Sequence, residues 1–336
     1  MAKKDAPSFD ILQPMLRADL FGHADAEKTF LDAWNNREVR PLHPAWILTG
    51  AKGIGKATLA HRIARFIFAN SQLSTLEIPA DSPEFQRYAD GGYSDLQILS
   101  LDTEPEEKAS ISVDSVRRMI DGLRMSASDG GWRVVIIDSI DDMNRNAANS
   151  LLKILEEPPA QTLFLIVAHK LSGVLPTIKS RSAVIRLRAL PDADVRKLVF
   201  DIVGDGADLE RVSRVASAAG GSVAKALSIM GSAADDFPDL FETARIISDP
   251  TAKSSRLLEI SKHLSSSPDS MNILLDVIYN LSITPQSTLH TPHLSDLYFT
   301  AASELASQRA LNLEADATAY KIIRDIRKCL LIPTAI

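Results

Sequence analysis

A glycine-rich loop constrains the fold of this 336-residue chain more than any other feature. A short apolar run precedes the loop, and apolar residues at helical spacing follow it. Residues 50–58 match the phosphate-loop pattern at Gly50, Gly55 and Lys56, and Gly53 adds a third glycine. The glycines let backbone N–H groups turn toward a phosphate, and the following helix N-terminus attracts negative charge. The sequence therefore predicts a strand, a phosphate-binding turn and a helix in succession.

The loop departs from the pattern at the position that handles magnesium. Ala57 follows Lys56 where the pattern requires Ser or Thr, whose hydroxyl normally ligates the metal. Thr58 comes one residue later, about 100° around the helix, so we expect it not to substitute. We expect these residues to hold ATP or ADP without efficient magnesium-assisted hydrolysis.

A second set of candidate residues follows another apolar run, residues 134–137. The run ends in Asp138, which can hold magnesium through its water shell. Ser139 comes next, and an uncharged serine with a high pKa is a poor general base. Asp141 and Asp142 are expected to be exposed charges at the start of the next helix.

Apolar runs separated by helical patterns indicate a parallel sheet covered on both faces. The expected strands are residues 45–49, 96–99, 134–137, 163–167 and 184–187. A helix is expected to begin after Ser112 as its N-cap, and another is expected to run through Leu155 until Pro158 and Pro159 stop it.

Strand patterns vanish after Pro191, where helical patterns take over. We expect an α/β domain over residues 1–190, a small helical domain over 191–232 and an all-helical domain over 238–336. Residues 231–239, rich in Gly, Ser, Pro and Asp, are the candidate linker.

Composition excludes several classes of protein. A net charge of −6 argues against a protein whose main partner is DNA, because basic residues dominate DNA affinity. The single cysteine can form neither an internal disulfide nor a cysteine-rich zinc site. No apolar run approaches the roughly 20 residues of a membrane span, and we expect a cytoplasmic protein.

Three further stretches, with the glycine loop, carry a resemblance to a known family. Residues 138–144 and 146–159, the latter ending Leu-Leu-Lys-Ile-Leu-Glu-Glu-Pro-Pro, are similar to the signature of bacterial clamp-loader subunits of the AAA+ class. So are residues 175–182, which end in Ser-Arg-Ser. The resemblance covers roughly residues 20–230, whereas the C-terminal third is similar only in being helical and of suitable length.

The resemblance implies roles for particular residues. Arg181 matches an arginine finger that reaches the ATP site of a neighbouring subunit, and Ser182 replaces the family's Cys. His169 takes the sensor 1 position, where a structural histidine is the competing interpretation, and Lys225 replaces the usual Arg of sensor 2. Ser139 stands where active AAA+ ATPases usually carry Glu.

The resemblance also implies a function. We expect a non-hydrolysing subunit of the delta-prime kind, with a helical lid domain and a helical collar domain. Its expected partners are clamp-loader ATPase subunits and a delta subunit, with the sliding clamp and primer-template DNA contacted through the complex. An active ATPase motor subunit is the alternative, and a small-molecule P-loop kinase or a plain nucleic-acid-binding protein fits less well.

Many clamp-loader subunits of this type carry a four-cysteine zinc module after the first helix. Residues 71–95 contain no cysteine, but hold Pro79, Pro83, Gly91 and Gly92. We therefore expect a loop without metal there, with no zinc among the cofactors.

Overall fold

The computed structural model divides into two compact units, Met1–Ala189 and Leu190–Ile336. The structure describes residues 13–69, 74–104, 110–123, 127, 131–204, 208–231, 240–249, 251–265, 271, 274–275, 278, 298, 300–305, 308 and 314–330.

The first unit is built around a five-stranded parallel sheet in the order β2-β3-β4-β1-β5. Its strands are β1 Ala45–Thr49, β2 Leu96–Ser100, β3 Arg133–Asp138, β4 Thr162–Ala168 and β5 Ala183–Arg186. All five strands that the apolar runs predict are confirmed, with ends within one residue of the expected ones. The parallel arrangement is confirmed as well.

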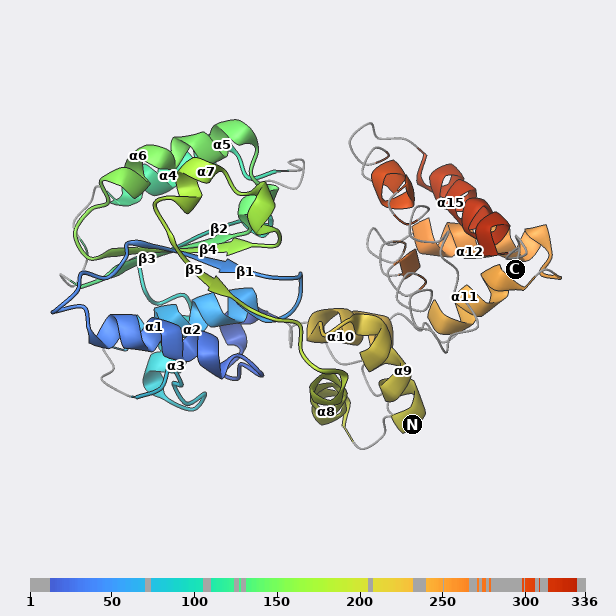
Figure 1. The fold of residues 1–336 in the computed structure, drawn as a ribbon, viewed down its shortest axis with the longest axis horizontal. Helices are drawn as coiled ribbons and strands as arrows, with labels where there is room; N and C mark the ends of the chain where they lie inside the picture. The colour runs from blue at the N-terminus through green and yellow to red at the C-terminus, as the bar shows by residue number, and fades with distance from the viewer. Residues whose placement is uncertain are drawn as a thin grey trace. The chain divides into compact units, whose positions relative to one another are not determined.

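Helices cover both faces of this sheet (Figure 1). On one face lie α1 Ala24–Asn35, α2 Lys56–Phe68 and α3 Pro83–Ala89. On the other lie α4 Val113–Leu123, α5 Arg145–Ser150, α6 Leu152–Glu156 and α7 Pro176–Lys179. Short 3-10 helices are η2 Pro14–Leu16, η3 Leu101–Thr103, η4 Ile140–Asp142 and η5 Leu171–Gly173.

Side chains along the central strands pack alternately into two separate hydrophobic cores. In β1, Trp46 and Leu48 pack in the core with α1 and α2, whereas Ala45 and Ile47 pack in the core with α4 to α7. Successive side chains of a strand point to opposite faces, so an apolar run with no polar interruption supplies both cores. Because these strands pair in parallel, the carboxyl ends of β1, β3 and β4 come together at one edge of the sheet.

Two local expectations differ from the structure. The helix expected to run through Leu155 is divided at Leu151 into α5 and α6. The prediction of a loop over residues 71–95 is wrong where helix α3 forms. Pro83 sits in the first turn of α3, and the Ser82 hydroxyl accepts from the Phe85 N–H at 3.2 Å, so this proline starts a helix.

The second unit is helical throughout the part that the structure describes. Its helices are α8 Asp192–Val203, α9 Leu209–Ala219, α10 Val223–Gly231, α11 Leu240–Ser248, α12 Ser254–Ser265 and α15 Ala315–Leu330. Gly220, in the left-handed region at φ 58°, ends α9. Of the candidate linker 231–239, Gly231 is the last residue of α10 and residues 232–239 lie outside the described residues, so the division into domains over 191–232 and 238–336 stays a prediction. None of the described helices has the length and apolarity to cross a bilayer.

Candidate phosphate site and an arginine at the opposite edge of the sheet

The glycine loop has the backbone geometry of a phosphate cradle. Gly50, Gly53 and Gly55 have φ values of 151°, 78° and 103°, which L side chains rarely adopt. A Cβ on Gly50 would lie 2.5 Å from the carbonyl oxygen of Leu187, so no larger residue fits there. Gly55 is the N-cap of the 13-residue helix α2, whose free N–H groups face the loop.

Lys56 is held inside this loop. It is the first residue of α2, 3% exposed, and its Nζ donates to the Ala51 carbonyl oxygen at 2.5 Å. Burial lowers the pKa of Lys56 to about 8, although the charges of Asp138 and Asp141 oppose the shift. Lys56 thus carries most of its charge at pH 7 and can release Ala51 for a better acceptor such as a phosphate.

The magnesium position of the loop is occupied by a methyl group. Ala57 and Thr58 are both half-buried in the first turn of α2. Ala57 offers no oxygen, so the lysine is followed by a side chain that cannot ligate a metal. In the part of the chain that the structure describes, no group of three or more His, Cys, Asp or Glu is arranged to hold a metal ion.

Ser139 is held by hydrogen bonds to Asp142 of the same chain. It is 1% exposed at the carboxyl end of β3, and its Oγ donates to Oδ2 of Asp142 at 2.6 Å. The Ser139 backbone N–H donates to the same oxygen at 3.3 Å, so the pair begins η4 as a capping box. The Ser139 hydroxyl therefore donates its hydrogen bond to the Asp142 carboxylate and is not available to polarise an attacking water. Asp142 is half-buried and engaged, so the expectation of an exposed charge is wrong for this residue.

His169 joins the end of β4 to this cluster. Its backbone N–H donates to Oδ2 of Asp141 at 2.5 Å. The His169 Nδ1 is buried without a hydrogen-bond partner among the described residues. Burial, and next the charge of Lys56, lower the pKa of His169, so the ring is mainly neutral at pH 7. The structure thus brings Lys56, Asp138, Ser139 and His169 together at one edge, as parallel strands require.

Arg181 lies elsewhere, after α7 and before β5. Its guanidinium is partly exposed, with 35% of the side chain accessible. Nη2 pairs with Glu156 Oε1 at 2.6 Å, while Nη1 donates to the Thr177 carbonyl oxygen at 2.9 Å. No sequence pattern links Glu156 to Arg181, since strand β4 and helix α7 come between them along the chain.

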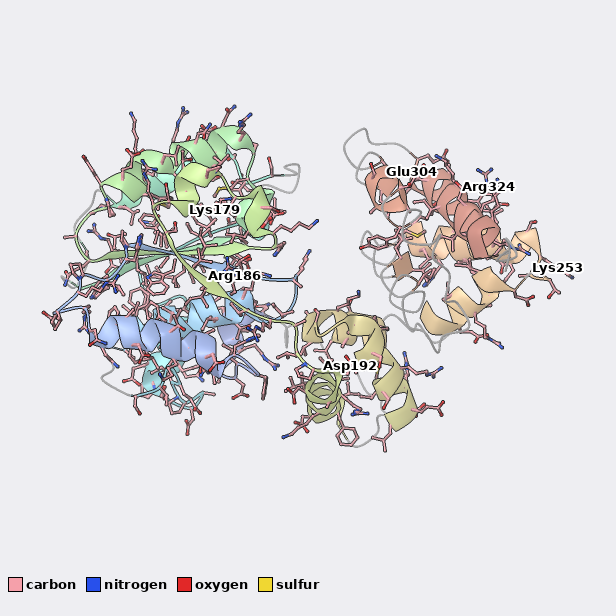
Figure 2. The ribbon with its side chains drawn as sticks, viewed as in Figure 1. Lys179, Arg186, Asp192, Lys253, Glu304 and Arg324 are labelled. Carbon is pink, nitrogen blue, oxygen red and sulfur yellow. The ribbon has the colours of Figure 1, made fainter. Side chains whose placement is uncertain are left out.

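Strand direction places Arg181 and the glycine loop at opposite edges of the sheet. Gly50 follows the last residue of β1, whereas Arg181 precedes the first residue of β5, and Ala183 pairs with Trp46. Trp46 stands four residues before Gly50, which is about 13 Å at 3.3 Å per residue, and Arg181 lies two residues before the Ala183 that pairs with Trp46. Figure 2 labels Lys179 and Arg186, which lie on either side of this point along the chain. An arginine side chain does not span that distance, so Arg181 cannot reach its own chain's phosphate loop.

Lys225 belongs to the second unit. It lies half-buried in α10, and its backbone N–H donates to the Ser222 hydroxyl at 3.2 Å. Its contact with a nucleotide stays a prediction.

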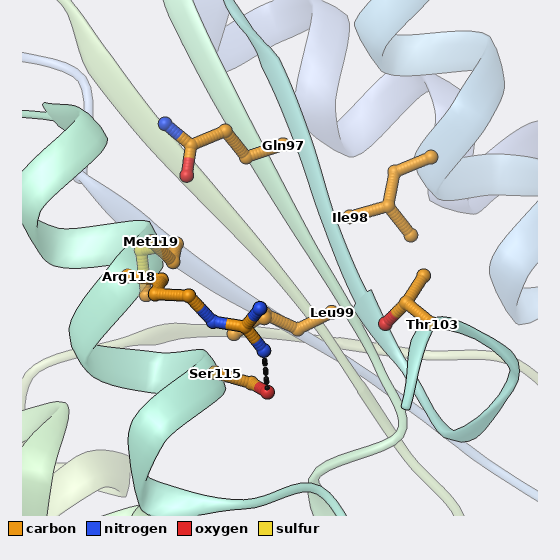
Figure 3. Close-up of a pocket in the computed structure, with 7 residues that line it drawn as sticks. All are labelled: Gln97, Ile98, Leu99, Thr103, Ser115, Arg118 and Met119. Carbon is orange, nitrogen blue, oxygen red and sulfur yellow. Dashed lines mark hydrogen bonds between the residues drawn. The ribbon is translucent and has the colours of Figure 1, made fainter. Parts of the chain in front are cut away.

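A separate pocket lies between edge strand β2 and helix α4 (Figure 3). Within it, Arg118 Nη2 donates to the Ser115 Oγ at 2.8 Å, one turn away on the same helix. Its lining residues are Gln97, Ile98, Leu99, Thr103, Ser115, Arg118 and Met119. None of the site residues expected from the sequence is among them, so this pocket is distinct from the glycine loop.

Fold and site together define a P-loop α/β protein of the AAA+ class. Residues 26–191 match the family model described as DNA polymerase III, delta subunit. The chain is 37% identical over 150 residues to DNA polymerase III subunit delta' of Pseudomonas aeruginosa, covering 44% of each chain. It is 26% identical over 227 residues to subunit gamma of Buchnera aphidicola subsp. Schizaphis graminum, covering 66% of this chain and 61% of that relative. The chain therefore belongs to the clamp-loader family of DNA polymerase III subunits, of the delta-prime or the tau/gamma kind.

The match spans about half the length of these curated relatives. Among solved structures, a gamma-subunit-related protein from Thermotoga maritima aligns with 90% of this chain and 99% of its own, at TM-score 0.46 and 17% identity.

Proposed function

We propose that this chain is the delta-prime subunit of a bacterial clamp loader, which does not hydrolyse ATP itself but lends Arg181 to the ATP site of a neighbouring subunit. The observation that carries the proposal is the separation of Arg181 from the chain's own phosphate loop by the length of the sheet. A partly exposed guanidinium at that edge is available to a second subunit. There it would neutralise charge developing on the γ-phosphate.

The chain's own loop would bind ATP or ADP without turning it over. Gly50, Gly53, Gly55 and Lys56 fit a phosphate by their backbone angles and charge, and Thr58 and Lys225 would add contacts. Ala57 supplies no magnesium ligand. Asp138 and Asp141 are the acidic groups whose charges act on Lys56. No cofactor is required for the proposed role, and zinc has no part in it.

The proposed partners follow from this role. Clamp-loader ATPase subunits and a delta subunit would form a cytoplasmic hetero-oligomer with this chain. That complex would open the sliding clamp and place it on primer-template DNA for the replicative polymerase. The second helical unit would supply a lid and a collar that joins the subunits.

The test is reconstitution of the loader with an Arg181→Ala chain. We expect ATP hydrolysis at the site that Arg181 serves to fall roughly a thousandfold, with assembly intact by size-exclusion chromatography. Arg40→Ala is the matched control. Arg40 is an exposed arginine that precedes β1, at the end of that strand away from the glycine loop. A normal hydrolysis rate in the Arg181→Ala complex would overturn the proposal.

The alternative is an ATPase motor subunit of the same loader. The retained Lys56 and Asp138 favour this alternative. So do the relatives named gamma and tau, which match over a longer stretch of this chain than the delta' relative does. Against it stand the methyl group of Ala57 and the hydroxyl of Ser139 that donates to Asp142.

A further inference from the structure

Glu156 occupies a position that helix stability does not explain. It is the last residue of α6, and Pro158 and Pro159 follow after the C-cap residue Glu157. The free carbonyls at a helix C-terminus repel a carboxylate, which is why acidic residues favour the other end. A cation beside the carboxylate offsets this repulsion, and Arg181 supplies one to Glu156.

Among the described residues, the Arg181 guanidinium has three acceptors, and Glu156 differs from the other two. The Thr177 carbonyl oxygen at 2.9 Å and the Ser180 Oγ at 3.2 Å are neutral, and both lie within four residues of Arg181. Glu156, at 2.6 Å, is charged and comes from another helix. Glu156 therefore fixes the direction of the guanidinium relative to α6, whereas the local acceptors move with Arg181.

The pair is accessible enough to be broken. The Arg181 side chain is 35% exposed and the Glu156 side chain 48% exposed, so water and salt screen their attraction. A triphosphate carries several negative charges where the carboxylate carries one. A neighbouring nucleotide can therefore take the guanidinium from Glu156.

We propose that Glu156 is a positioning residue, which holds Arg181 in a resting place until a nucleotide in the neighbouring subunit displaces it. This inference rests on the proposed function, because it assumes that Arg181 acts in trans. It adds the intramolecular contact with which that action must compete.

The experiment compares Glu156→Gln with Glu157→Gln in the reconstituted loader. Glu157 is the adjacent exposed carboxylate at the C-cap of α6, so both variants remove one charge from the same turn. We expect Glu156→Gln to lower the KM for ATP about two- to fivefold, because an exposed ion pair no longer competes with the nucleotide. The kcat should stay within about twofold of wild type, and Glu157→Gln should match wild type in both constants.

Three readouts separate this role from a structural one. Added salt should shrink the ratio of the wild-type KM to the Glu156→Gln KM, since salt screens the pair that only wild type contains. Glu156→Asp should restore part of the wild-type KM. In the isolated full-length chain, NMR of the Arg181 Nε–H should show slower guanidinium rotation in wild type and Glu157→Gln than in Glu156→Gln.

The outcomes are distinguishable. If Arg181→Ala leaves hydrolysis unchanged, the proposed function and this inference both fail. If Arg181→Ala lowers hydrolysis but Glu156→Gln equals Glu157→Gln in KM, only the role of Glu156 is overturned. That role is also overturned if Glu156→Gln lowers the KM equally in an Arg181→Ala background.

Discussion

The polar groups at the two edges of the sheet all bond within the chain, but they differ in how far they are exposed to solvent. At the carboxyl edge, Lys56, Ser139 and the His169 backbone N–H all bond to acceptors of their own chain. At the amino edge, Arg181 is partly exposed and pairs with an exposed carboxylate. Buried groups that hydrogen-bond within the chain hold its conformation and are not available to a ligand. An exposed group in a solvent-screened ion pair can instead exchange that pair for a contact with another subunit. The difference implies that substitutions at the carboxyl edge lower the stability of the isolated chain more than substitutions at the amino edge, which act mainly on the complex.

The largest effect on the isolated chain should come from Gly50→Ala. An alanine at this position would have to adopt a strained φ, and its Cβ would collide with the Leu187 carbonyl oxygen and the Ile54 side chain. We expect the free energy of unfolding in urea to fall by about 2–4 kcal/mol. Gly131→Ala is the control, because a Cβ there meets nothing within 4 Å. Equal stabilities for the two variants would show that the carboxyl edge is not a rigid region.

A smaller effect should appear in the pH dependence of ADP binding. Burial lowers the pKa of Lys56 to about 8, and a bound phosphate would raise it again. ADP affinity should therefore be close to full at pH 7 and below, and fall about tenfold between pH 7 and pH 9, as Lys56 loses its proton in the free chain. Calorimetric titration at several pH values measures it, and Lys56→Gln should bind weakly at all of them. An affinity in the wild-type chain that does not change across this range would contradict the assignment of Lys56 to the phosphate.

The pKa of Lys56 also sets the sign of a stability change. The folded chain releases the Lys56 proton near pH 8, whereas the unfolded chain keeps it to the ordinary value of 10.5. The unfolded state binds more protons in this window, so the contribution of Lys56 to the free energy of unfolding rises with pH from 8 to 10.5.

The smallest effect should be that of Arg181→Ala on stability. The substitution removes a pair whose two side chains are both partly exposed. We expect the free energy of unfolding to change by no more than about 0.5–1 kcal/mol. A loss of several kcal/mol would mean that Arg181 is structural, and the contrast between the edges would disappear.

Much of the first unit can be predicted from the sequence because its strands are buried on both faces. Continuous apolar runs such as residues 163–167 have few other solutions, and β4 forms there. Helix α3 escapes prediction because Pro79, Pro83 and the glycines after it suggest a loop. The signal is nevertheless present in Ser82-Pro83-Glu84, an N-cap followed by proline in the first turn.

The candidate site is predictable only where one segment carries it. Residues 50–58 contain the whole phosphate loop, and Ser139 with Asp142 fits a capping-box pattern that the sequence displays. Contacts across the fold, such as His169 with Asp141 and Arg181 with Glu156, depend on how neighbouring strands and helices align. No local pattern specifies those alignments. The place of Arg181 at the opposite edge from Gly50 likewise follows from strand order and direction.

The most direct measurement is steady-state ATP hydrolysis by the isolated chain in the presence of magnesium, beside a Lys56→Ala variant. A chain that lacks the magnesium hydroxyl at Ala57, and in which Asp142 accepts from Ser139, should hydrolyse ATP no faster than this variant. Clear turnover that Lys56→Ala abolishes would contradict the account and assign this chain to the ATPase subunits.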